Sequence, residues 1–166
     1  MKTIELSTRL DASPDLVWQC VNTPRLLHYV AAGWLKFLPI DPPAFPERWE
    51  DREYRLALRA FGLLPLGWQI VGIERPRAED GRRILRDNGR SPLLRCWDHR
   101  IIVEAAPAGG TRYTDRVSIE AGILTLPITV FARGFFAHRQ RRLRGLVTQG
   151  LEAFLSADRQ RPTRTA

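Results

Sequence analysis

The chain begins with an alternating segment followed by two helix starts. In residues 3–10 apolar side chains alternate with polar ones, a period of two that is typical of a half-buried strand. Ser13-Pro14 and Thr23-Pro24 each place a capping hydroxyl directly before a proline that suits the first helical position. We therefore predict one strand and then two short helices, the second ending near residue 30.

A run of antiparallel strands follows. Four prolines between residues 38 and 47 predict a loop or an extended connection there. After it, alternating apolar positions separated by Gly-, Pro- or Asn-containing turns predict about five or six strands. Their expected cores are residues 52–60, 68–74, 83–86, 94–104 and 111–120. Within the turn at residues 106–110, the segment 107–110 gives the strongest hairpin signal.

The last element reads as a long amphipathic helix. Its apolar side chains recur at spacings of three and four, at Phe136, Leu143, Leu146, Val147, Leu151 and Phe154. Arg139, Arg141, Arg142 and Arg144 fall largely off this stripe and are expected on a solvated face. A curved antiparallel sheet must cover its apolar face, and a helix across it would do so. The pattern predicts an α+β fold.

Length and composition fit one globular domain. The chain has 166 residues, of which 44% are hydrophobic and two are Cys, so no disulfide framework is expected. The first residues lack an apolar signal core, and the apolar stretch 117–137 is interrupted by Glu120, Pro127 and Arg133. We expect a cytoplasmic protein without a transmembrane segment, with a single domain over residues 1–156 and a basic, disordered tail over 157–166.

The net charge of +8 is uneven along the chain. Eight Arg lie between residues 133 and 164 against Glu152 and Asp158, so most of the excess is in the last helix and tail. A basic surplus suggests nucleic acid or an anionic membrane as partner, and a solvated helix face is the simpler interpretation. Residues 1–132 are nearly balanced.

The sequence resembles the START/Bet v 1-like (SRPBCC) superfamily, including its polyketide cyclase/dehydrase-like proteins. The resemblance covers roughly residues 3–155 and rests on three segments: IELSTRLDASPDLVWQCVNTPRLLHYV, WDHRIIVEAAPAGGTRYTDRVSIE and FFAHRQRRLRGLV. It implies a helix-grip fold, in which a curved antiparallel β-sheet wraps around a long C-terminal α-helix, with two short helices after the first strand. It also implies a mostly apolar cavity between sheet and helix that suits a hydrophobic small molecule or lipid.

The predicted hairpin brings three polar residues to one face. Trp97, His99, Ile101 and Val103 share a face of one strand, and Tyr113 and Asp115 share a face of the next. An even register would place His99 opposite or diagonal to Asp115, where the carboxylate could orient the imidazole for proton transfer.

The same pair has a structural interpretation, because a buried Asp and His must be hydrogen-bonded in any case. The sequence does not fix the register, and a slip of one residue would turn Asp115 outward and make Arg100 its partner. His99, Asp115 and Tyr113 therefore stand as candidates for structural, ligand-orienting or catalytic roles.

Further candidates for the cavity are aromatic. Tyr54, Trp68 and Trp97 could line it with polar tips, and Arg52, on the face of Tyr54, could bind a ligand carboxylate. Each also has a simpler structural interpretation: the aromatic residues as core side chains, and Arg52 as a solvated residue at a strand end. His and Cys show no metal-ligand spacing, and no phosphate loop, GxGxxG or GxSxG motif is present, so we expect no metal and no cofactor.

Three functions remain open at this point. The first is binding of a hydrophobic small molecule or lipid by a monomer or homodimer. The second is a cofactor-free cyclase, dehydratase or aromatase that uses His99, Asp115 and Tyr113 as acid–base groups. The third is a module that contacts RNA, ribosomes or membrane through the Arg-rich helix; nucleic acid is the less favoured partner, because aromatic residues do not interleave with Arg139–Arg144.

Overall fold

The architecture is a single curved sheet crossed by one long helix. The computed structural model describes residues 1–77 and 80–159. Seven antiparallel strands follow the order β1-β7-β6-β5-β4-β3-β2. The strands are β1 Lys2–Leu10, β2 Leu35–Asp41, β3 Glu53–Ala60, β4 Leu64–Glu74, β5 Arg83–Gly89, β6 Cys96–Ala105 and β7 Thr111–Glu120. This is the α+β helix-grip arrangement that the sequence predicted.

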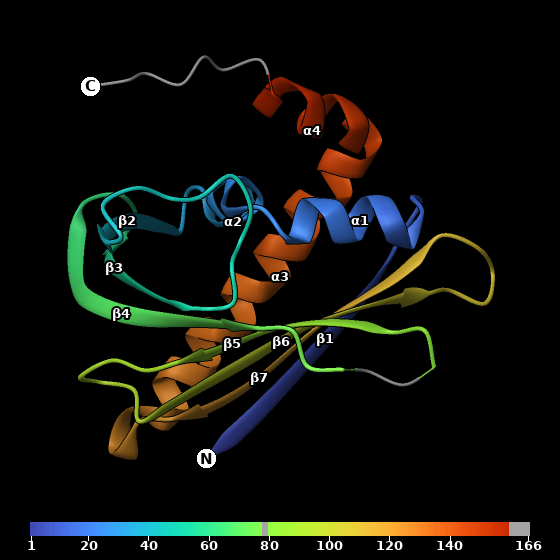
Figure 1. Cartoon of the computed structure of the whole chain (residues 1–166). Helices are drawn as coiled ribbons and strands as arrows, with labels where there is room; N and C mark the ends of the chain where they lie inside the picture. The colour runs from blue at the N-terminus through green and yellow to red at the C-terminus, as the bar shows by residue number, and fades with distance from the viewer. Residues whose placement is uncertain (78–79, 160–166) are drawn as a thin grey trace.

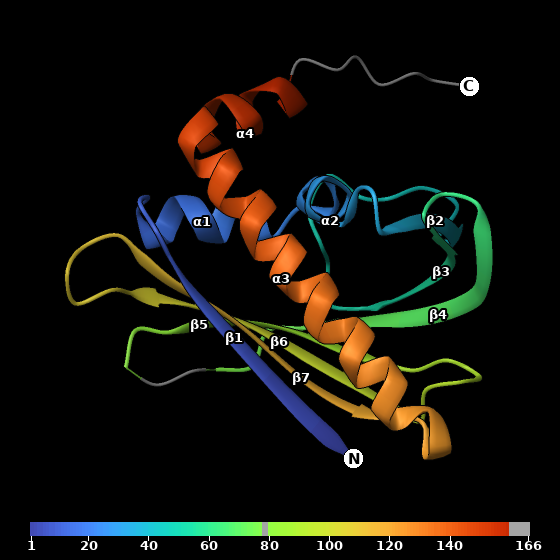
Figure 2. The ribbon, with the colours of Figure 1, turned by 180° about the vertical axis from the view of Figure 1, so that it is seen from behind.

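The helices lie together on one side of the sheet. They are α1 Pro14–Val21, α2 Pro24–Ala31, the 3-10 turn η1 Gly122–Leu124, α3 Thr125–Gln149 and α4 Leu151–Arg159. Helix α3 packs against β1, β7 and α2, and it crosses the sheet diagonally (Figures 1 and 2). Its path leaves the inner faces of β3 to β6 facing α2 and the first half of α3.

Both short helices start where the sequence predicts. The Ser13 Oγ accepts a hydrogen bond from the Leu16 N–H at 3.3 Å, and the Thr23 Oγ1 accepts one from the Leu26 N–H at 3.2 Å. These bonds satisfy amides that a helix leaves without partners in its first turn. Pro14 and Pro24 then occupy the first helical positions.

Several boundaries differ from the sequence-based expectation. The proline-rich connection is partly a strand, because β2 runs through Pro39; β2 lies at the edge of the sheet, where a missing N–H costs no ladder bond. Strand β4 starts at Leu64, earlier than predicted. It continues through Gly67, and its pairing with β3 shifts register between Leu58 and Arg59. Strand β5 extends to Gly89.

The C-terminal helix also differs. It begins at Thr125, ahead of the predicted stripe, and it is interrupted at Gly150, whose φ of +103° ends α3 and lets α4 turn away. The predicted disordered tail over 157–166 stays a prediction, since α4 extends to Arg159 and residues 160–166 lie outside the described part of the chain. Among the described residues, no helix is long and apolar enough to cross a membrane.

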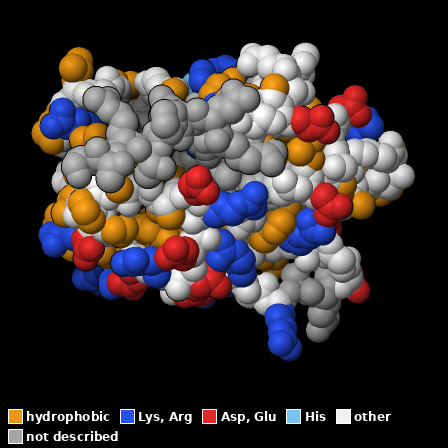
Figure 3. Space-filling view, turned by 45° about the horizontal axis from the view of Figure 1, so that its top comes forward, with side chains coloured by type: hydrophobic (Ala, Val, Ile, Leu, Met, Phe, Trp, Pro, Cys, Tyr) orange, Lys and Arg blue, Asp and Glu red, His pale blue; other side chains and the backbone are white. Residues whose placement is uncertain are grey.

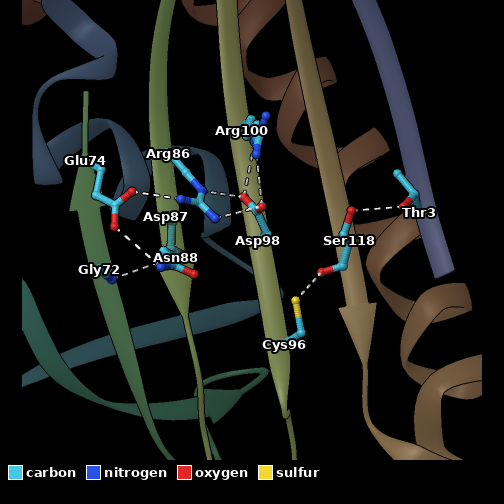
Figure 4. Close-up of polar contacts among 10 residues, drawn as sticks. All are labelled: Thr3, Gly72, Glu74, Arg86, Asp87, Asn88, Cys96, Asp98, Arg100 and Ser118. Atoms are coloured by element: carbon cyan, nitrogen blue, oxygen red, sulfur yellow. Dashed lines mark hydrogen bonds and ion pairs between the residues drawn. The ribbon is translucent and has the colours of Figure 1, made fainter. Parts of the chain in front are cut away.

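Opposite faces of the sheet differ in chemistry. The outer face carries polar contacts: Arg86 donates to Asp98 at 2.9 Å and 3.0 Å and to Glu74 at 2.9 Å (Figure 4). The inner face carries the core, whose fully buried members include Tyr54, Leu56, Val103, Tyr113 and Val117. Asp98 and His99 are neighbours in sequence but belong to opposite faces, as the alternation of β6 predicts.

The β6–β7 hairpin gives a test of the fold. Gly110 has φ of +76°, and a Cβ there would lie 2.4 Å from the Leu10 carbonyl oxygen, whereas Gly109 has φ of +81° with open space around it. We expect Gly110→Ala to lower the free energy of unfolding by about 2 kcal/mol or more, from backbone strain plus the clash. Gly109→Ala should cost distinctly less, since it carries the strain alone. Urea denaturation of both variants measures the difference; equal losses would contradict the close approach.

Candidate functional site

A cavity of about 510 Å³ lies between the inner face of the sheet and helices α2 and α3. Most of its walls are aliphatic or aromatic. Lining side chains come from α2, from β2 to β6 and from α3, and include Leu26, Phe37, Leu58, Val71, Leu85 and Phe135. Volumes of this size are typical of sites for small organic molecules.

The rim of the cavity is apolar as well. Exposed hydrophobic side chains that line it come from the β3–β4 turn, the start of β4, the β5–β6 loop, η1 and the first turns of α3: Phe61, Leu64, Leu66, Leu93, Leu124 and Phe131. Hydrophobic side chains gather on the left of Figure 3, the side on which Figure 1 draws the β3–β4 turn. An apolar ligand could therefore enter without crossing a charged rim.

A few polar side chains face this apolar space. They are Thr23, Gln69, Asp87, Ser91, His99 and Arg139. Polar groups placed singly in an apolar pocket orient a ligand, because each must find a partner when water is displaced. Among them, Asp87, His99 and Arg139 can carry charge.

His99 and Asp115 form the pair that the even register allowed. Their strands place His99 opposite Val117 and Ile101 opposite Asp115, so the two residues are diagonal neighbours on the inner face. The His99 Nε2 lies 2.8 Å from the Asp115 Oδ1. The alternative in which Asp115 points outward to Arg100 is wrong, because Asp115 is 0% exposed.

Asp115 is bonded from three elements. Its Oδ1 accepts from His99 on β6 and from the Tyr113 hydroxyl on β7 at 3.2 Å, and its Oδ2 accepts from the Gln140 amide on α3 at 3.0 Å. The same Gln140 amide also donates to the Leu6 carbonyl at 2.8 Å. Both carboxylate oxygens are therefore occupied within the protein.

The environment sets the charge of the pair. Burial opposes ionisation of Asp115, but the hydrogen bond from His99 and the charge of Arg139 outweigh it and hold the pKa of the carboxyl below its ordinary value. Burial lowers the pKa of His99, against the effect of Asp115. Burial and then Asp115 raise the pKa of Tyr113. At neutral pH, Asp115 is ionised and His99 is neutral, donating from Nε2 and leaving Nδ1 as an acceptor.

Arg139 is the main correction to the sequence analysis. It was expected on the solvated face, but only 7% of its surface is exposed and it lines the cavity. Its guanidinium carbon lies 5.0 Å from the centre of the Phe136 ring and 5.7 Å from that of Phe135. The signal was present, because Arg139 is three residues after Phe136 and four before Leu143, which continues the buried stripe.

Asp87 is the second residue that sequence reasoning missed. It lines the cavity from β5, and its Oδ1 accepts a hydrogen bond from the Gly72 N–H at 3.0 Å (Figure 4). Burial raises the pKa of Asp87 to about 8, against the opposing effects of that bond and of Arg139. The predicted strand stopped at residue 86; continuing the inward alternation from Leu85 would have found it.

Not every predicted site residue reaches the cavity. Trp68, Trp97 and His99 line it, with Trp68 half-exposed beneath the Arg55 guanidinium. Tyr113 and Asp115 are buried and absent from the lining, because the network just described holds them within the fold.

Tyr54 and Arg52 do not line the cavity either. The Tyr54 hydroxyl accepts from the Glu50 N–H at 3.0 Å, and its ring packs edge-on against Trp49. Arg52 is exposed and lies over the Tyr54 ring at 5.5 Å. Their ligand-binding roles stay predictions that the placement does not favour.

The three arginines that follow Arg139 within α3 donate hydrogen bonds to other groups of the fold. Arg142 donates to the Tyr29 carbonyl at 2.7 Å, Arg144 to the Thr8 hydroxyl at 2.9 Å, and Arg141 to the His138 Nδ1 at 3.1 Å. Within residues 1–77 and 80–159 no cluster of three or more His, Cys, Asp or Glu could hold a metal ion.

Together, the antiparallel sheet, the helix across it and the enclosed cavity define a START/Bet v 1-like fold. Solved structures agree. A START superfamily protein from Mycobacterium smegmatis matches with a TM-score of 0.57 and 11% identity, over 89% of this chain and 97% of its own. The Zhui aromatase/cyclase from a Streptomyces species matches with a TM-score of 0.56 and 10% identity, over 89% and 94%. A Chromobacterium violaceum protein matches with a TM-score of 0.59 and 16% identity, over 88% and 97%.

The sequence also matches a family model. Residues 8–146 match the model of a domain of unknown function, DUF8410, and the chain belongs to that family. No curated protein matches the chain.

The position of Asp87 predicts a pH effect on stability. An acid whose pKa is higher in the folded than in the unfolded state stabilises the fold at low pH, and this contribution is lost as the pH rises through the folded value. For Asp87 the window runs from its ordinary value near 3.8 to about 8. The free energy of unfolding of the wild type should fall across this window relative to that of Asp87→Asn. Urea titrations of both proteins test this, and parallel profiles would rule it out.

Proposed function

We propose that this protein binds a hydrophobic small molecule or lipid in the cavity between sheet and helices. The observation that carries the proposal is the cavity of about 510 Å³ with apolar walls and an apolar rim. Transferring an apolar ligand from water into such a space gains free energy in proportion to the area removed from water.

Exposure of the rim supports the same proposal. Phe61 and Leu93 are 62% and 59% exposed, although large hydrophobic side chains gain by burial. A ligand in the mouth would cover part of this surface. The solved structures share the fold of this chain. The ligand class is inferred from the chemistry of this chain's own cavity, because one fold serves many functions.

Filling the cavity should abolish binding. Leu58 lines the cavity from β3, and Leu155 on α4 is equally half-buried but lies away from it. We expect wild type and Leu155→Trp to increase the fluorescence of the hydrocarbon dye diphenylhexatriene, and Leu58→Trp to lose most of that increase, because the indole occupies the dye's space.

Two outcomes decide this proposal. Native mass spectrometry of the purified protein should also show a co-purified apolar molecule or a dye complex of one-to-one stoichiometry. Failure of the wild type to bind the dye, or undiminished binding by Leu58→Trp, would remove the proposal.

A second candidate function is cofactor-free acid–base catalysis, as in a cyclase, dehydratase or aromatase. The specific observation is that His99 lines the cavity while Asp115 holds its Nε2. This leaves Nδ1 as a base of neutral imidazole within an apolar site, an arrangement that suits proton abstraction. Tyr113 and Asp115 would act through His99 as positioning residues, since neither lines the cavity.

A kinetic test separates catalysis from binding. On a substrate with several ketone groups, His99→Asn should reduce turnover by about a hundredfold or more while dye binding stays near that of wild type. Asp115→Asn should lower turnover less and shift its pH profile, because it alters the imidazole's orientation and pKa. Unchanged turnover in both variants would end this candidate and leave the binding function.

The third hypothesis is an Arg-rich helix face that contacts RNA, ribosomes or membrane. No specific observation favours it. Arg139 faces the cavity, and Arg141, Arg142 and Arg144 donate to groups of this chain.

A further inference from the structure

The cavity contains a cation whose hydrogen-bonding capacity is not fully used. Arg139 is 93% buried, and its Nε is the one buried side-chain nitrogen or oxygen among the described residues that lacks a hydrogen-bond partner. Leaving a buried donor unpaired costs free energy, and more so when the group is charged. Because Arg139 also lines the cavity, its incompletely paired guanidinium points to a ligand there that supplies an acceptor.

The carboxylates near Arg139 do not supply it. None of the ion pairs found among the described residues includes Arg139. Asp115 is fully buried, and His99, Tyr113 and Gln140 occupy its oxygens. Arg139 acts on it only through space, as its effect on the pKa of Asp115 shows.

Asp87 adds a second donor to the same space. Below about pH 8 burial keeps the Asp87 carboxyl protonated, so it carries an O–H that can donate. The charged groups that act on its pKa are Arg139 from α3 and Asp98 from β6, and the uncharged donors are the Gly72 N–H of β4 and the Trp97 side chain of β6. His99 is its ladder partner on β6, and the neutral Gln69 of β4 lies beside it.

We propose that the bound molecule carries a neutral carbonyl oxygen at its polar end, held by the Arg139 guanidinium and the Asp87 carboxyl inside the apolar cavity. This inference rests on the proposed binding function and names its ligand class: an apolar ketone or a related carbonyl compound.

Charge balance selects the carbonyl over a carboxylate. At neutral pH the buried network holds one cation, Arg139, and one anion, Asp115, while His99 and Asp87 are neutral. A carboxylate ligand would add an uncompensated negative charge in a medium that solvates it poorly. A ketone satisfies the free donors and adds no charge.

The different cost of removing a ketone and an alkane from water distinguishes this site from a purely apolar cavity. A ketone is better solvated by water than an alkane of equal length, so an apolar cavity without polar recognition would prefer the alkane. A site built to hydrogen-bond an oxygen rejects the analogue that lacks it. A site with polar recognition should therefore bind the ketone more tightly than the alkane, whereas a purely apolar cavity should bind the alkane more tightly.

The experiment displaces diphenylhexatriene from the protein with methyl nonyl ketone, undecane or undecanoate. Wild type should bind the ketone at least about tenfold more tightly than undecane, and more tightly than undecanoate. Arg139→Met should lose the preference for the ketone while its affinity for undecane changes little.

The pH arm uses the wild type and a conservative variant. Ketone affinity should fall as the pH rises through about 8, where Asp87 ionises and turns from donor to acceptor. In Asp87→Asn the amide keeps a donor and carries no charge, so the ketone should still bind and the dependence on pH should vanish. This arm stands even if Arg139→Met fails to fold.

The outcomes separate the two proposals. Dye binding with no advantage of the ketone over undecane, or with undecanoate bound best, overturns the carbonyl inference and leaves the binding function. Absence of dye binding removes both. A ketone preference that persists in Arg139→Met and at high pH would show that other groups hold the oxygen, and would also overturn the inference.

Discussion

The buried Asp115 carboxylate is the contact on which the arrangement of sheet and helix depends. A charge with no exposure to water must be bonded on all sides, and here the donors come from β6, β7 and α3. Gln140 ties the same helix to β1 through the Leu6 carbonyl. These bonds fix the position of α3 across the sheet, and therefore fix what the preceding residue, Arg139, can reach.

The cavity follows from that geometry. Because α3 packs against β1 and β7, the inner faces of β3 to β5 have no helix directly upon them and enclose apolar space instead. The polar groups divide accordingly: the charge of Asp115 is satisfied within the fold, whereas Arg139, Asp87 and His99 line the cavity. Structural and ligand-facing polar groups thus share one network, and changing either alters the pKa values of the other.

Local sequence patterns predicted much of this fold and part of the site. The two helix starts, the β6–β7 hairpin and the inward face of His99, Tyr113 and Asp115 follow from capping residues and a period of two. Other features were missed for physical reasons. Pro39 was read as interrupting a strand, although an edge strand tolerates proline, and Asp87 lay beyond the assumed end of β5. Arg139 was assigned to solvent by its charge, although its spacing fits the buried stripe.

By itself the sequence determined the fold class, because periodicity, caps and turns are properties of neighbouring residues. It also restricted the candidate chemistry to one strand face. Only the tertiary structure decided that Asp115 and Tyr113 are enclosed within the protein while His99 reaches the cavity, and that Arg139 and Asp87, fifty-two positions apart in sequence, both line it. The reason is that burial, and with it the pKa and the free hydrogen-bonding capacity of a group, depends on all the elements that surround it, and those are brought together only by the packing of α3 on the sheet.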